Sequence, residues 1–267
     1  MASQRFRQPR VAELVASKLR DDILTGRLKE GDVLPSQEAL FAEFGVSPPA
    51  LREAIHLLET DGLISVRRGN VGGALVHHPT AERTAHMISM VLQSRAATPV
   101  DVSAALMHLE PVCAGMCAAR EDRMSEVVPY LQSEIDIQTA QFDDLSQYVP
   151  NARRFHETLV SRCGNESMIL LIGSLELIWS AHESAVWNGH GEPAPMVDKT
   201  RRAALRDHQR LLDAISDGNA ARAVRLAQDH LAAARRNTLA FGTDQIIEAK
   251  LVSNFDLHPN GRKGSGA

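Results

Sequence analysis

One segment near the start of the chain carries helix, turn and strand signals in a fixed order, and this order restricts the fold more than any other feature. Ser36 begins a short helix that Gly45 ends, and Ser47 begins the next helix. Two short extended stretches, residues 63–67 and 74–77, follow with a glycine-rich connection between them. Two helices around a glycine turn and then a β-hairpin are the layout of a winged helix-turn-helix, so the segment predicts DNA binding.

The second of these helices has one polar face. Leu51, Ala54 and Leu58 recur at helical spacing and face inward, so Ala50 and Arg52 face outward. Charged residues on a helix are by themselves usually a solvated face. The ordered set of turns and helices around them is what favours a contact with DNA.

Residues 11–76 resemble the N-terminal domain of the GntR family of bacterial transcription regulators. The family's pattern appears here as Leu34-Pro35-Ser36, Gly45-Val46-Ser47, Leu51-Arg52-Glu53-Ala54-Ile55 and Arg67-Arg68-Gly69. The resemblance implies that the DNA contacts come from Ser36, Ser47, Ala50, Arg52, Arg67, Arg68 and Gly69. An arginine on the recognition helix can take guanine in the major groove, and a basic wing tip can approach the minor groove or the backbone.

Two positions depart from that pattern. The family usually has glutamate then arginine after the leucine-proline-serine step, and arginine after the valine-serine step, whereas this chain has Gln37-Glu38 and Pro48. The segment is also not basic, because residues 1–78 hold ten Lys or Arg and ten Asp or Glu. We therefore expect a few placed cations on a homodimer to supply the affinity for DNA, and binding to depend on salt.

The rest of the chain reads as helices. With 267 residues the chain has room for two domains, and we expect residues 9–78 to form the DNA-binding domain and residues 79–245 an all-helical effector-binding and dimerisation domain. Residues 246–267 are expected to be a disordered tail. The predicted fold class is mainly α: a winged helix-turn-helix with a small β-hairpin, followed by an all-α bundle of six or seven helices.

The chain shows neither a signal peptide nor an apolar run that would cross a membrane, so we expect a cytoplasmic protein with no membrane partner. The cysteines Cys113, Cys117 and Cys163 fit a reducing compartment. Cys113 and Cys117 could share a metal across one helical turn, but they lie among alanines, which favours a core position.

Three histidines lie where helices can bring them together, and here the resemblance extends to the C-terminal FCD domain of the FadR-type branch of the GntR family. The matching pairs are Phe155-His156, followed by Gly164-Asn165, then Asp207-His208, and His230-Leu231. The resemblance implies a metal site at His156, His208 and His230, for Zn²⁺ or another divalent ion such as Ni²⁺ or Mn²⁺. It also implies effector contacts from these three histidines, Asn165 and His108.

The usual fourth ligand is missing. Many members of the branch have an aspartate one turn before the first histidine, but this chain has Ala152 there, and Asn151 is one residue off that face. Losing the carboxylate should weaken metal binding and make it more dependent on pH. The arginine often found one turn before Glu110 is absent too, which makes a small carboxylate effector less assured.

These patterns predict a ligand-responsive repressor that binds a pseudo-palindromic double-stranded DNA operator as a homodimer, with an organic acid or an acyl compound as effector, and not an enzyme. Two alternatives stay open. The histidines could be metal-free core or pocket residues of a regulator that senses an acyl thioester or another apolar ligand, with Trp179 and Trp187 as candidates for the pocket wall. A metal-dependent enzyme built on the helical bundle is the other.

Overall fold

The computed structural model describes residues 10–67, 73–189, 198–239 and 245–253. The chain divides into two compact units, Met1–Thr80 and Ala81–Ala267, and each is described by itself. The division falls after Thr80, two residues beyond the boundary expected at residue 78.

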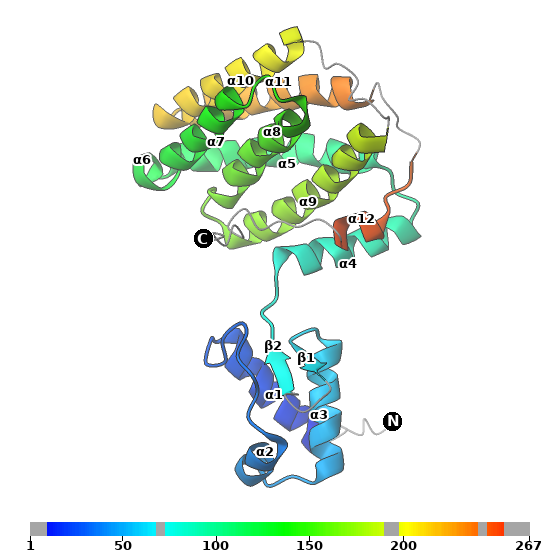
Figure 1. Cartoon of the computed structure of the whole chain (residues 1–267). Coiled ribbons are helices and arrows are strands. Elements are labelled where there is room, and N and C mark those ends of the chain that lie inside the picture. Colours follow the sequence, from blue (N-terminus) through cyan, green and yellow to red (C-terminus); the bar gives the residue numbers. More distant parts are fainter. Residues whose placement is uncertain (1–9, 68–72, 190–197, 240–244, 254–267) are drawn as a thin grey trace, which may run out of the picture. The chain divides into compact units, whose positions relative to one another are not determined.

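The first unit contains three helices and a two-stranded antiparallel hairpin (Figure 1). In chain order these are α1 (Val11–Leu24), α2 (Gln37–Phe44), α3 (Pro48–Thr60), β1 (Ile64–Arg67) and β2 (Gly73–Val76). The strands pair Ile64 with Val76 and Arg67 with Gly73, as a hairpin requires. The predicted winged helix-turn-helix is confirmed.

Local sequence explains the boundaries of α2 and α3. The Ser36 hydroxyl accepts a hydrogen bond from the Ala39 amide at 3.2 Å, which satisfies one free N–H group at the start of α2. Gly45 ends the helix at φ 60°, a left-handed conformation that glycine adopts without steric cost. Ser47 then precedes α3, and Pro48 and Pro49 occupy its first turn, where a missing N–H costs nothing.

The first unit has its own apolar core, which fixes how α3 lies. Leu51, Ala54 and Leu58 are at most 1% exposed, and α3 packs along α1, whose Leu19 and Ile23 are also buried. Burying this face leaves the opposite face of α3 in solvent.

Within the described ranges, the second unit contains seven long helices and two short ones. The long ones are α4 (Ala81–Ser94), α5 (Pro99–Ala119), α7 (Val128–Ala140), α8 (Leu145–Ser161), α9 (Glu166–Gly189), α10 (Asp198–Ser216) and α11 (Ala220–Leu239). The short ones are α6 (Arg123–Glu126) and α12 (Ala249–Ser253). The prediction of an all-helical second domain is confirmed.

Helix α5 is central to this unit and contacts α8, α9, α10 and α11 (Figure 1). Its closest neighbour is α11. Gly115 allows this close approach, because a Cβ atom at that position would lie only 2.8 Å from the Val224 side chain. By length and composition alone α5 could cross a membrane, but 56% of its apolar window is buried inside the unit, as expected for the core helix of a globular domain.

The expectation of an unstructured tail from residue 246 is wrong for its first part. Ile247 is fully buried, Val252 is 2% exposed, and α12 packs against α4 and α9. The Glu248 amide donates to His182 Nε2 at 2.9 Å, which ties this segment to α9. The stretch has only three buried apolar residues, Ile247, Ala249 and Val252, which is too few to show a helical or strand period along the sequence, so the contact could not be predicted. Residues 254–267 lie outside the described part of the chain.

Candidate DNA-binding surface and metal centre

The exposed face of α3 carries the charged residues expected on a recognition helix. Arg52, Glu53 and His56 are all exposed. Glu53 accepts a hydrogen bond from Arg10 at 3.4 Å. Among the residues described, no carboxylate pairs with Arg52, so its guanidinium is available to a base edge or a phosphate.

The other predicted DNA contacts differ in exposure and in whether their side chains are already hydrogen-bonded. Ser47 is exposed and its hydroxyl caps no amide of α3, which leaves it available to a phosphate. Ser36 is exposed but engaged at the start of α2, Ala50 is half-buried, and Arg67 is exposed at the end of β1. The predicted contacts Arg68 and Gly69 lie outside the described residues.

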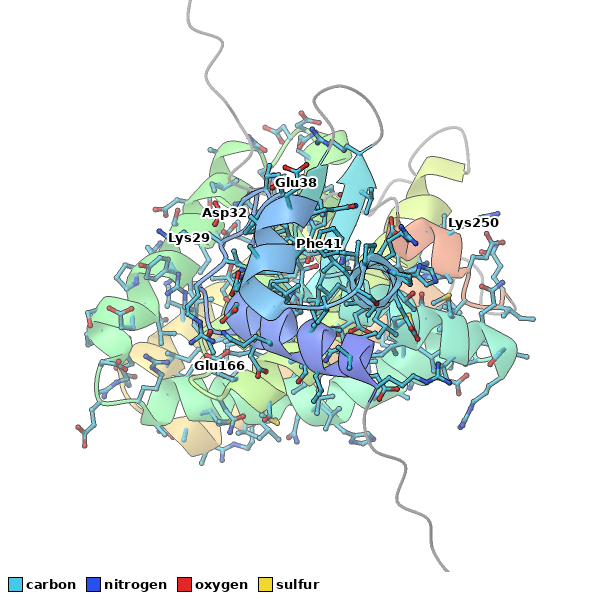
Figure 2. The ribbon with its side chains drawn as sticks, turned by 90° about the horizontal axis from the view of Figure 1, so that it is seen from below. Lys29, Asp32, Glu38, Phe41, Glu166 and Lys250 are labelled. Carbon is cyan, nitrogen blue, oxygen red and sulfur yellow. The ribbon has the colours of Figure 1, made fainter. Side chains whose placement is uncertain are left out.

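The acidic substitution noted on α2 lies on its surface. Figure 2 shows Glu38 and Phe41 on this helix and Lys29 and Asp32 in the preceding loop. Glu38 is exposed, and it stands where the resembling family usually has an arginine. A negative charge therefore replaces a positive one on the helix that precedes the recognition helix.

The second unit brings three buried histidines together. His156 lies on α8, His208 on α10 and His230 on α11, and each is at most 6% exposed. The Nε2 atom of His230 is 3.2 Å from Nε2 of His208 and 3.2 Å from Nε2 of His156. Three nitrogen atoms from three helices thus converge on one point.

Each histidine turns its other ring nitrogen, Nδ1, toward an oxygen atom. His156 Nδ1 is 2.5 Å from Glu110 Oε1, and His208 Nδ1 is 2.9 Å from Gln138 Oε1. His230 Nδ1 faces Asp207 Oδ2 at the longer distance of 3.8 Å. Oxygen acceptors at Nδ1 favour the tautomer with its proton there, so the lone pairs of Nε2 point at one another.

Burial keeps two of these rings neutral. It is the main cause that lowers the pKa of His156 well below 6.5, and the nearby Arg153 charge lowers it further. Burial is also the main cause for His208, whose pKa falls well below 6.5, followed by the neighbouring His230 and His156. Neutral imidazole is the form that binds a metal ion.

This donor set fits a divalent metal ion. A tetrahedral zinc site has Zn–N bonds of about 2.0–2.1 Å, which places its nitrogen atoms about 3.3–3.4 Å apart, close to the spacing found here. Oxygen groups that orient ligating histidines through Nδ1 are the usual outer partners of such sites. Asn151 does not complete the site, because its Nδ2 donates to Gln141 at 2.7 Å. At Ala152 no ligand is available, so a bound ion would keep an open position.

Two predicted effector residues lie away from this cluster. His108 is exposed on α5, and the Asn165 side chain accepts from the Met168 amide at 3.1 Å at the start of α9. The structure does not bring either residue to the three histidines. Sequence reasoning did not predict that Glu110, Gln138 and Asp207 face the Nδ1 atoms of the three histidines. The one local signal was that Asp207 directly precedes His208 in the sequence.

The cysteines belong to the core, as expected. Cys113, Cys117 and Cys163 are all buried and free. Burial raises the pKa of Cys117 to about 12, and it also raises the pKa of Cys113. Thiols that stay protonated are poor metal ligands, which agrees with a packing role.

Comparisons with known proteins match both units. The family model described as bacterial regulatory proteins, gntR family, matches residues 11–72, and the FCD domain model matches residues 101–233. The HTH-type transcriptional repressor NanR of Salmonella arizonae is 24% identical over 239 residues, which cover 87% of this chain and 86% of that protein. NanR of Klebsiella aerogenes is 24% identical over 243 residues and covers 87% of each chain.

A solved structure shares the fold. The structure of Streptococcus agalactiae GntR aligns with a TM-score of 0.64 at 22% sequence identity, over 85% of this chain and 99% of that one. At this identity the likeness shows the fold alone.

Proposed function

Since this chain belongs to the GntR family of DNA-binding bacterial regulatory proteins and carries the FCD domain, we propose that it is a ligand-responsive transcriptional repressor whose effector domain holds a divalent metal ion. The observation that carries the proposal is the convergence of three histidine Nε2 atoms inside the unit that the FCD model matches. Repression is supported by the NanR relatives, which are transcriptional repressors. These relatives are regulators rather than enzymes, and a cytoplasmic location follows from the same role.

Operator binding would depend on two copies of the first unit. One unit carries as many acidic as basic residues between positions 1 and 78, so a single copy offers little electrostatic attraction for DNA. A homodimer doubles the number of placed cations, and its two-fold symmetry fits a pseudo-palindromic operator. In each copy α3 would enter the major groove, with Arg52 reading a base and Ser47 holding a phosphate.

The metal would be held by His156, His208 and His230. A bound Zn²⁺, Ni²⁺ or Mn²⁺ ion would supply a Lewis acid that attracts an oxygen atom of an effector. Glu110 and Gln138 hold the rings of His156 and His208 at Nδ1, and Asp207 faces Nδ1 of His230, so the Nε2 atoms would be the ones to hold the ion. An effector that binds here can relieve repression only if it binds two arrangements of the dimer with different affinity.

Two measurements test this function. In the first, operators selected from a random pool of double-stranded DNA are titrated with protein by fluorescence anisotropy. We expect Arg52→Ala to weaken binding by about 1–3 kcal/mol. The control is Arg225→Ala, an exposed arginine on α11, which should bind as the parent does. Unchanged binding by Arg52→Ala would refute the recognition role of α3.

In the second, metals are counted per chain in protein purified without a tag or a chelator. Near one ion per chain, lost in His156→Ala, is the expected result. Metal-free parent protein would refute the metal centre and favour the metal-free regulator, in which the same histidines line the pocket of a more apolar effector. A turnover screen with added zinc would separate a sensor, which leaves its ligand unchanged, from an enzyme.

A further inference from the structure

The first turn of the recognition helix α3 presents an apolar surface to solvent. Pro48 and Pro49 are both exposed, and Ala50 beside them is half-buried. The ring carbons of proline and the methyl group of alanine neither donate nor accept a hydrogen bond. The side chains of this turn therefore offer only carbon atoms to a molecule that touches it.

The backbone of the same turn offers few donors. The first N–H groups of a helix usually lack a partner within the helix and can hold an anion or a polar edge. In α3 two of these groups are missing, because both positions are proline, and the Leu51 amide donates to the Ser47 carbonyl at 3.1 Å. The turn is therefore poorly suited to any group that needs an N–H donor.

The two prolines share the exposed face of α3 with Arg52. Arg52 lies four residues after Pro48 and three residues after Pro49, and residues at these spacings are neighbours on one helix face. The opposite face, which includes Leu51 and Ala54, is buried in the core of the first unit. A surface that Arg52 meets is therefore met by the prolines one turn earlier.

The major groove of DNA offers a fitting apolar partner, the C5 methyl group of thymine. Guanine and adenine present acceptor atoms at the same edge, and these need a donor. A proline ring packed on the methyl group removes apolar surface of both partners from water, whereas packed on guanine it leaves two acceptors without a donor. In helix-turn-helix proteins the N-terminal residues of the recognition helix contact the base edges, so this turn is placed to meet them.

We infer that Pro48 and Pro49 are specificity-determining residues that select thymine in the operator by packing on its methyl group in the major groove. The inference rests on the proposed entry of α3 into that groove. It adds a second way of reading bases on the same helix. Arg52 reads a base by hydrogen bonds, and the turn before it reads a base by apolar contact.

The test removes the methyl group without changing base pairing. Each thymine of an operator selected from a random DNA pool is replaced in turn by 2′-deoxyuridine, which pairs with adenine but lacks the methyl group. The affinity of the full-length protein is measured by fluorescence anisotropy. We expect a loss of about fourfold per methyl group at one or two thymines of each half-site, which corresponds to one buried carbon group. An operator in which no replacement changes the affinity would overturn the inference.

A matched pair of variants assigns the effect to the prolines. The double variant Pro48→Ser, Pro49→Ser should bind the thymine and deoxyuridine operators with equal affinity. The control is Pro129→Ser, because Pro129 is also an exposed proline in the first turn of a helix, α7, but lies in the other unit. This control should keep the fourfold difference. If the double variant keeps it too, the methyl groups act elsewhere or through the shape of the DNA, and the inference fails.

A change of base preference gives a second test, which does not depend on a loss of binding. Selection of operators with Pro48→Arg should replace thymine by guanine at one methyl-sensitive position of each half-site, because arginine donates to both acceptors of guanine. Selection of the same thymine by this variant would overturn the role of Pro48.

Arg52→Ala separates the inference from the proposed function. If Arg52→Ala weakens operator binding while deoxyuridine has no effect, α3 enters the groove and only the role of the prolines is refuted. If neither change alters the affinity, the proposed entry of α3 into the groove is refuted as well.

Discussion

Zinc should raise the melting temperature of the protein, and His208→Ala should remove that effect. A metal that binds the folded state at a concentration 100 times its dissociation constant stabilises it by about 2.7 kcal/mol. For a domain of this size each kcal/mol raises the melting temperature by about 2–4 °C. We therefore expect an increase of roughly 5–11 °C when zinc is added to chelator-treated protein.

The variant needs a correction for its own packing. The His208 ring stacks on Phe155 with ring centres 4.1 Å apart, so its removal leaves a cavity and destabilises the metal-free protein as well. The informative quantity is the difference between melting temperatures with and without zinc, measured for each protein by differential scanning calorimetry. That difference should fall close to zero in His208→Ala.

A second buried histidine provides the control. His182 on α9 bonds the Ile178 carbonyl and the Glu248 amide and lies outside the cluster. His182→Ala should lower the melting temperature while keeping the full increase upon zinc addition. The reasoning fails if the parent shows no increase, or if His208→Ala keeps it, because the three Nε2 atoms would then not form the binding site.

Three further predictions concern single positions. Glu38→Arg should tighten DNA binding and should steepen the slope of log K against log salt concentration by about one unit per half-site. The control is Glu166→Arg, at an exposed residue of the helical unit (Figure 2), which should change neither the affinity nor the slope. Ala152→Asp should tighten zinc binding at least tenfold in a competition titration against a chelating dye, and an unchanged affinity would show that this position does not face the ion. Burial is the main cause that lowers the pKa of His182 below 6.5, so the unfolded state binds more protons below that pH, and His182's contribution to stability should be lost as pH falls. The protection factors of the amides of residues 247–252 against hydrogen exchange should therefore fall between pH 7 and pH 5.5. In His182→Gln, whose side-chain oxygen can still accept from the Glu248 amide, this dependence on pH should disappear.

Sequence periodicity and turn residues were enough to predict the elements of both units. Gly45 and Ser47 mark the turn between α2 and α3, and the structure has the expected left-handed glycine there. The meeting of His156, His208 and His230 could be expected only through the family resemblance, since 74 residues separate the first from the last. No pattern within a single helix indicates which faces of different helices pack together.

The burial of Arg153 could not have been predicted by the same means. Arg153 and Arg154 are adjacent on an amphipathic helix, where a pair of arginines normally indicates a solvent-exposed face. In the structure the side chain of Arg153 is only 12% exposed because Glu176 and Glu183 meet it from α9. Burial of a charge depends on partners from other helices, which periodicity along one helix does not report.

The absence of a carboxylate at position 152 links the metal to the effector. Three imidazole ligands bring no negative charge into direct contact with a divalent ion, whereas an aspartate ligand would cancel one of its two positive charges. An acid effector bound at the open position would bring a negative charge to the ion, so metal and acid should each bind more tightly when the other is present. Because such coupling is reciprocal, the factor by which zinc increases affinity for the acid must equal the factor by which the acid increases affinity for zinc. Ala152→Asp supplies the charge from the protein itself, and should therefore reduce this shared factor while it strengthens zinc binding alone.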